Sequence, residues 1–86
     1  MEHLILECTV KICTQSVGVK IFKEDGKDGV LESFSFSLSD YFRNDNDATI
    51  YYPSNRDNTL EGCISMLRAY MSRFTNIAET EKNKQF

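Results

Sequence analysis

The chain has 86 residues, 41% of them hydrophobic and 12% aromatic, which is enough apolar material for one small core and too much for a disordered chain. Its formal net charge of -3 disfavours binding along a phosphate backbone and suits a partner with a basic surface. No stretch approaches the roughly 18 apolar residues of a membrane span, and the apolar start is interrupted at Glu7, so neither a membrane segment nor a secretory signal is expected. These properties predict one cytoplasmic domain that covers residues 1–86.

Alternating apolar and polar residues predict three strands in the first half of the chain. Residues 4–14 and 17–22 alternate on either side of a short turn, as half-buried strands do. Residues 23–29 contain two Asp-Gly pairs, a dipeptide that supplies the positive φ angles of hairpin turns, so the chain should reverse there. Residues 32–39 alternate most clearly, with one apolar face and one face lined by serine. The apolar face of this third strand consists of Phe34, Phe36 and Leu38.

A fourth strand is expected just before the only proline. Residues 43–47 form a polar cluster typical of a turn, and residues 48–52 are short, β-branched and aromatic, as an edge strand would be. Pro53 cannot donate a hydrogen bond to a strand ladder and should end this strand, after which residues 54–57 form a loop. The predicted sheet therefore occupies residues 4–52.

From Asn58 onward the apolar period changes to that of a helix. A helix over residues 58–79 would be roughly 33 Å long, with Asn58 as its cap and Glu61 completing a capping box. Gly62 costs such a helix about 1 kcal/mol relative to alanine. A glycine is found there either because another group approaches the backbone or because the position is unoptimised, and we favour the second explanation. Residues 80–86 are charged and polar and should fray. The apolar stripe contains Leu60, Cys63, Ile64, Leu67, Tyr70, Met71, Phe74, Ile77 and Ala78.

Together these elements predict an α+β fold. It would contain an antiparallel sheet of about four strands, in the order β-β-β-β-α, with one long C-terminal helix packed on one face. The helix stripe should dock on Phe34, Phe36 and Leu38. The opposite face of the sheet must then be solvated or covered by a partner.

No catalytic or cofactor-binding set is recognisable. The only histidine, His3, lies near a terminus, which argues against a histidine-based triad or a multi-histidine metal site. Motifs for nucleotide phosphates are absent, and residues 45–47 lack the glycine and glutamate that a calcium loop requires. Other carboxylates fall in turns, where their pKa values should stay ordinary. We therefore expect a protein that is not an enzyme and that uses no cofactor or metal.

The cysteines favour a reducing compartment. Cys8, Cys13 and Cys63 make an odd count without a CxxC pair, so reduced thiols are expected rather than a disulfide framework or a zinc site. Cys8 and Cys13 should lie on opposite faces of the first strand, where they cannot pair with each other.

Acidic turns and isolated aromatic residues are the candidate binding features. Negative turns would steer the chain toward another protein with a basic, for example nucleic-acid-binding, surface. Aromatic side chains on a solvated face can anchor such a contact. The leading hypothesis is an inhibitor or adaptor that occupies a partner's surface. Its candidate partner-binding residues are Phe22, Glu24, Asp25, Asp28, Tyr41, Asp45, Asp47 and Tyr51.

In outline, a short chain with a strand meander, one helix, acidic turns and no catalytic set resembles small phage or bacterial inhibitors, such as anti-CRISPR proteins and toxin-immunity proteins. Two alternatives stay open. A structural subunit or homodimer would form through an exposed edge strand or the overhanging helix. A single-stranded nucleic-acid-binding domain would use the solvated sheet face. Scattered basic residues make direct nucleic-acid binding the weaker alternative.

Overall fold

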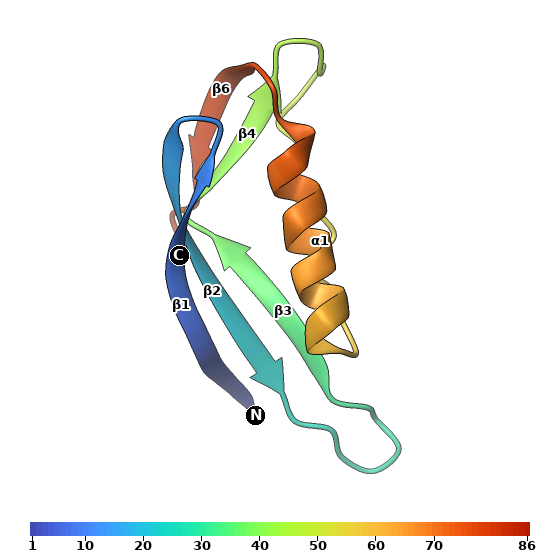
Figure 1. Cartoon of the computed structure of the whole chain (residues 1–86). Coiled ribbons are helices and arrows are strands. Elements are labelled where there is room, and N and C mark those ends of the chain that lie inside the picture. Colours follow the sequence, from blue (N-terminus) through green and yellow to red (C-terminus); the bar gives the residue numbers. More distant parts are fainter.

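An antiparallel four-stranded sheet and a single helix form the main part of the computed structural model, which describes residues 1–86 (Figure 1). The predicted α+β class and antiparallel sheet are confirmed, and the helix lies against one face of the sheet. The sheet order is β1-β2-β3-β5, so β1 is an edge strand. Its strands are β1 (Glu2–Ile12), β2 (Gln15–Glu24), β3 (Ser33–Leu38) and β5 (Arg56–Asp57).

The helix α1 spans Leu60–Arg73, so the prediction of a long C-terminal helix over residues 58–79 is wrong. Thr59, not Asn58, caps its start, because the Thr59 hydroxyl accepts a hydrogen bond from the Gly62 amide at 3.0 Å. Asn44 holds the opposite end. Its side-chain amide donates to the Arg73 carbonyl, and its side-chain oxygen accepts from the backbone amides of residues 75 and 76. These contacts satisfy the backbone outside a helical ladder, so the chain leaves the helix there.

A second, two-stranded sheet corrects the remaining assignments. It pairs β4 (Asp40–Asn44) with β6 (Ile77–Lys82). Residues 43 and 44 of β4 were predicted to belong to a polar turn, and β6 spans the predicted helix end and the predicted frayed tail. The predicted strand over residues 48–52 is absent except for one isolated bridge between Tyr51 and Phe42. The order of strands therefore differs from the predicted meander.

The last residues turn back onto the sheet instead of fraying. The Asn83 side-chain amide donates to the Leu38 carbonyl at 2.8 Å. The Phe86 ring lies against Gly18, where a side chain would collide with it, and the Lys20 ammonium lies 4.2 Å from the centre of that ring. Part of the sheet face opposite the helix is thus covered by the chain itself.

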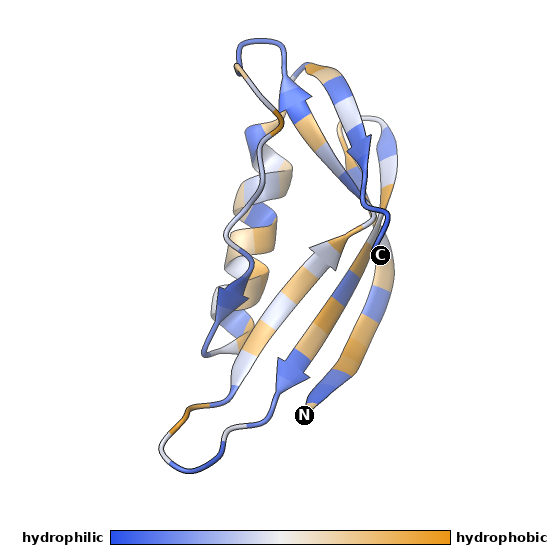
Figure 2. Cartoon of the chain, turned by 180° about the vertical axis from the view of Figure 1, so that it is seen from behind, coloured by the Kyte–Doolittle hydropathy of each residue, from blue (hydrophilic) through white to orange (hydrophobic).

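The core lies between α1 and the sheet and continues to β4. Figure 2 shows the apolar and polar residues alternating along the strands, as the sequence predicts. Docking of the helix onto β3 is confirmed, since the helical and strand side chains belong to one buried cluster and Phe34 packs against it. The buried cluster consists of Ile12, Val17, Val19, Ile21, Phe36, Leu38, Phe42, Cys63, Leu67, Tyr70 and Phe74.

Tyr70 joins the helix to the smaller sheet. Its hydroxyl accepts a hydrogen bond from the Phe42 amide at 3.0 Å and donates one to the Tyr51 carbonyl at 2.9 Å. Its ring stacks on Tyr51 with centroids 5.9 Å apart and meets the edge of Phe74 at 4.8 Å. Burial raises the pKa of Tyr70 to about 12, because a phenolate at this place would lose its hydration.

Side-chain groups approach the backbone at Gly62, so our preference for an unoptimised position is wrong. A side chain at Gly62 would overlap the Asp57 carboxylate and crowd the Thr59 hydroxyl. That carboxylate accepts hydrogen bonds from the Thr59 amide at 3.0 Å and the Thr59 hydroxyl at 2.8 Å. Both bonds lower the pKa of Asp57. The glycine therefore makes room for the capping contacts of the helix.

All three cysteines are free. Cys13 was predicted to lie in the first strand, but it lies in the two-residue turn after β1, where its φ is 56°. Its thiol donates to the Phe74 carbonyl at 3.3 Å. Cys8 is exposed on β1, and burial raises the pKa of the Cys63 thiol. The α1 helix is too short and too polar to cross a membrane.

Candidate functional site

The eight predicted binding residues fall into two groups at opposite ends of an elongated molecule that measures 45 × 20 × 20 Å. One group lies at the end of β2 and in the loop that follows it. The other lies on β4 and in the segment between β4 and β5. They cannot form one continuous surface. The first group is Phe22, Glu24, Asp25 and Asp28, and the second is Tyr41, Asp45, Asp47 and Tyr51.

In the first group, two carboxylates are occupied by the start of the chain. The N-terminal ammonium lies 3.2 Å from Glu24, and the His3 ring lies 2.7 Å from Asp25. The hydrogen bond to His3 is the main cause of a lowered pKa for Asp25. His3 is therefore part of β1 and not of a loose terminus, and Asp28 is the one predicted carboxylate without an ion-pair or hydrogen-bond partner.

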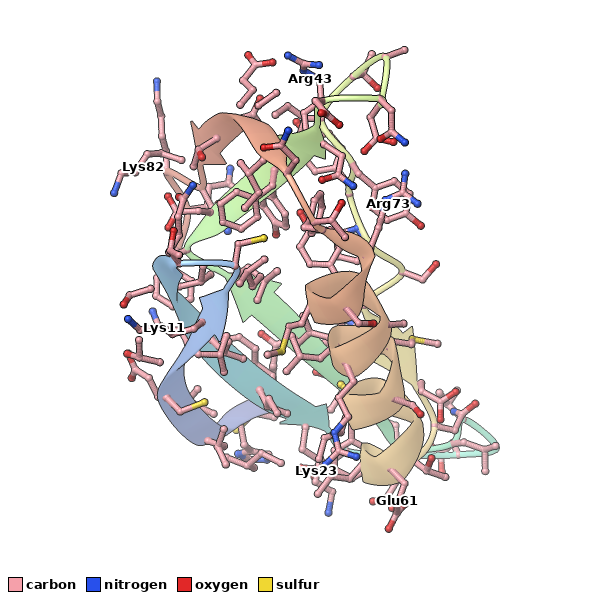
Figure 3. The ribbon with its side chains drawn as sticks, turned by 45° about the horizontal axis from the view of Figure 1, so that its top comes forward. Lys11, Lys23, Arg43, Glu61, Arg73 and Lys82 are labelled. Atoms are coloured by element: carbon pink, nitrogen blue, oxygen red, sulfur yellow. The ribbon has the colours of Figure 1, made fainter.

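In the second group, the acidic residues support the local structure. Asp47 lies 2.7 Å from the Arg73 guanidinium, and Asp45 accepts a hydrogen bond from Asn76. Figure 3 shows Arg73 at the end of α1, beside the loop that follows β4. The same guanidinium lies 3.8 Å from the centre of the Tyr51 ring. Because its charge is already paired with Arg73, Asp47 presents a weaker field to a partner than the sequence predicts, whereas Asp45 is held by a neutral amide and keeps its charge. Their role in binding stays a prediction, as does that of Tyr41 and Tyr51.

The structure also exposes apolar residues that sequence reasoning did not select. Leu4, Ile5 and Leu6 on β1 are 51%, 45% and 45% exposed, and Val30 and Leu31 after β2 are 67% and 73% exposed. The signal for the first set was three consecutive apolar residues, which break strict alternation; here β1 has an irregular register between Leu4 and Leu6. The signal for the second set was an apolar pair placed directly after a turn.

We call residues 25–32 the tip loop, since they extend beyond the sheet between β2 and β3 (Figure 1). Its outermost turn is an Asp-Gly hairpin turn with φ of 39° at Asp28 and 82° at Gly29. Lys27 and Val30 close this turn with two backbone hydrogen bonds, of 3.0 Å and 2.8 Å. Predicted chain reversal by Asp-Gly is thereby confirmed. Two positive φ angles and paired closing bonds give the turn a defined shape.

The base of the tip loop is also held in place. Lys23 and Glu32 form an ion pair of 3.2 Å across the two strand ends. Asn58, just before the helix, donates its side-chain amide to the Glu32 carbonyl at 3.1 Å. At Gly26 a side chain would collide with the backbone of residues 30–32, so the two arms of the loop lie against each other. The loop therefore presents its side chains from an ordered backbone.

The largest hollow of the surface lies elsewhere and is polar. It measures about 810 Å³ and contains only Tyr41 of the predicted binding residues. The Tyr52 hydroxyl donates to Glu81 at 2.5 Å on its wall, and this bond raises the pKa of Tyr52. Its lining residues are Ser37, Tyr41, Tyr52, Pro53, Asn55, Glu81, Lys82, Asn83, Lys84 and Gln85.

No protein-family model, curated protein or solved structure matches this chain. Within the structure, no three side chains of His, Cys, Asp or Glu lie close enough together to hold a metal ion. Two exposed apolar surfaces, the tip loop and the edge of β1, are therefore the candidate binding surfaces of the chain.

Proposed function

We propose that the chain is a non-enzymatic inhibitor or adaptor that binds another protein by inserting the tip loop into a cleft or groove on that protein. The observation that carries this proposal is the exposure of Val30 and Leu31, 67% and 73%, on an ordered loop that projects from the sheet. Apolar side chains exposed on a pre-ordered backbone lose little conformational entropy on binding. They can therefore act as anchors in a desolvated pocket.

One exposed carboxylate on the tip loop is available to a partner with a basic surface. Asp28 and its neighbour Lys27 are both exposed and form no ion pair within the chain, so the turn offers one free charge of each sign, and Asp28 is the one that a basic group would contact. A carboxylate beside two apolar anchors would speed association with a basic rim while contributing little to the final affinity. Among the acidic turns of the sequence, Asp28 is thus the one best placed for this role.

The test is affinity capture from the native host with immobilised wild-type protein, a Val30→Ser/Leu31→Ser variant and a Leu6→Ser control. Leu6 is also an exposed leucine, but it lies on β1 and not on the tip loop. A partner that is captured by the wild type and the control, and lost with the tip-loop variant, is expected. A partner retained by the tip-loop variant would show that the binding surface lies elsewhere.

Association and dissociation rates measured with the captured partner distinguish an anchoring role of Leu31 from electrostatic steering by Asp28. Leu31→Ala should raise the dissociation rate, by an amount equivalent to about 1–3 kcal/mol if Leu31 fills a pocket. Asp28→Lys should instead lower the association rate, and the wild-type association rate should fall as salt is added. Unchanged kinetics in both variants would contradict the proposal.

A further inference from the structure

The outer edge of β1 is open along most of its length. β1 has 11 residues and is the first strand in the sheet order, so one side of its backbone has no partner strand. Residues 2–9 are exposed, including the apolar Leu4, Ile5 and Leu6. β1 contains no proline that would prevent another strand from pairing with this edge. A long edge of this kind is a template for strand addition.

The turn after β1 decides which backbone groups point outward. Ile12 lies opposite Gln15 at the closing pair of the two-residue turn. Because hydrogen-bonded and non-bonded pairs alternate along an antiparallel ladder, the amides and carbonyls of Lys11, Thr9 and Glu7 are directed away from β2. The side chains of these three residues share one sheet face. The other face carries Leu6, Cys8, Val10 and Ile12.

Two charges on this edge have no partner within the chain. Glu7 and Lys11 form no ion pair, and Lys20, which lies opposite Glu7 on β2, donates instead to the Phe86 carbonyl at 2.6 Å. In Figure 3, Lys11 lies on the side of the hairpin turned away from α1. Glu7 and Lys11 are therefore both available to a strand that pairs with the open edge.

We propose that this strand is β1 of a second copy of the chain, paired antiparallel about a two-fold axis at Thr9. In this register Thr9 faces its own equivalent, and Glu7 of each copy faces Lys11 of the other. The opposite face then brings Cys8 against Val10 and Leu6 beside Ile12, whose side chain is already buried in the core, so every residue of this face is apolar. Opposite charges and apolar groups directly across an antiparallel pair both stabilise it.

Neighbouring registers lack this complementarity. An axis at Glu7 would place two carboxylates opposite each other, and an axis at Cys8 would place Ile5 opposite Lys11. A two-fold axis between two neighbouring residues would place outward-directed backbone groups of one copy opposite inward-directed groups of the other, so the two strands could not form a regular ladder. The charges of β1 therefore select Thr9 as the centre. The paired segment excludes the tip loop, so this inference does not rest on the proposed function.

The experiment is sedimentation equilibrium of the whole chain over a range of concentrations, with circular dichroism to confirm folding. Wild type should show a monomer-dimer equilibrium. Lys11→Glu should raise the dissociation constant at least about tenfold, because it turns both attractive pairs into repulsive ones. The matched control, Lys27→Glu, makes the same charge change in the tip loop and should leave the dissociation constant unchanged. The double exchange Glu7→Lys/Lys11→Glu should restore dimerisation.

Cross-linking tests the register independently. In a Cys8→Ser/Cys13→Ser background, Thr9→Cys should form an intermolecular disulfide on mild oxidation, since directly opposed residues lie within disulfide reach, about 5.5 Å between Cα atoms. Native Cys8 in a Cys13→Ser background should not, because it lies diagonally from its equivalent, about 7–8 Å away. A monomer at every concentration, a Lys11→Glu variant that dimerises like wild type, or a link through Cys8 in place of position 9 would each overturn the proposal.

Discussion

Replacing Tyr70 by Phe tests whether one hydroxyl joins the helix to the smaller sheet. The change keeps the ring contacts and removes only the bonds to the Phe42 amide and the Tyr51 carbonyl. Phe42 is 0% exposed, so water cannot replace the lost partner of its amide. An unpaired buried amide costs about 1–3 kcal/mol, and the second bond contributes about 0.5–1.5 kcal/mol. For a domain of this size, a loss of about 2 kcal/mol lowers Tm by roughly 8–16 °C.

Thermal unfolding followed by circular dichroism measures this effect, with Tyr52→Phe as the matched control. Tyr52 also donates through its hydroxyl, but it is 57% exposed, so its loss should change stability by no more than about 0.5 kcal/mol. If the Tyr70→Phe variant has the same Tm as the Tyr52→Phe control, the hydroxyl of Tyr70 does not join the helix to the smaller sheet.

Measuring the stability of both proteins at alkaline pH tests the same hydroxyl independently. The pKa of Tyr70 is raised from 10.0 to about 12 in the folded chain. As pH rises through this window, the unfolded chain loses the Tyr70 proton first and binds fewer protons than the folded one, so the stability of the wild type falls. Tyr70→Phe lacks this group, so its stability deficit relative to wild type should narrow as pH rises above about 10. A stability deficit that does not change with pH would contradict the burial of the Tyr70 hydroxyl.

Three further predictions concern the core, the helix start and the cysteines. Leu67→Ala should cost about 2–5 kcal/mol by leaving a cavity between α1 and β3, whereas Leu31→Ala on the tip loop should change stability little; equal Tm values for the two variants would contradict the helix-on-sheet core. Gly62→Ala should not give the usual gain of about 1 kcal/mol, because it displaces the Asp57 carboxylate, and the gain should return in an Asp57→Ala background. All three thiols should react with a thiol reagent after denaturation without prior reduction, and fewer than three would reveal a disulfide.

The elements that were predicted correctly are those whose side chains carry their own signal. Alternation in β2 and β3 reports a sheet with one buried face, and Asp-Gly reports the hairpin turn of the tip loop. Alternation also located the strand β1, but the prediction that β1 is half-buried is wrong over residues 2–9, which are exposed on both faces. The helical stripe from Leu60 to Tyr70 likewise reflects the face that packs on β3. In β2, β3 and α1, burial of a local pattern decides the structure.

β4 was missed because two of its three buried residues are polar, with Phe42 alone between them. Asp40 and Asn44 are only 9% and 7% exposed, yet their composition is typical of a turn. Asn44 can be buried because its amide bonds to the backbone after α1, about thirty residues along the chain. A polar side chain buried by distant partners leaves no periodic signal in its own segment.

β6 and the candidate site were missed for related reasons. Residues 77–82 are mostly exposed, so pairing with β4 and not burial makes them a strand. Without that partner, the apolar Ile77 appeared to continue the helix. Three of the five acidic residues chosen for their charge turned out to be paired with His3, Arg73 or the N-terminus, contacts that only the folded chain creates. The tip loop was located, but its role depends on exposure that sequence does not report.

The pairing of β4 with β6 predicts the order in which the parts of the chain assemble. β1 and β2 are joined by two residues and can form a hairpin as soon as they leave the ribosome. β4 must wait until the helix and β6 have been synthesised, since Arg43 and its partner Glu79 are 36 residues apart. During that interval the side chain of Phe42 and the amide of Asn44 lack their partners. Non-local pairing slows folding, so closure of the smaller sheet should be the last step of refolding and the stage most exposed to aggregation.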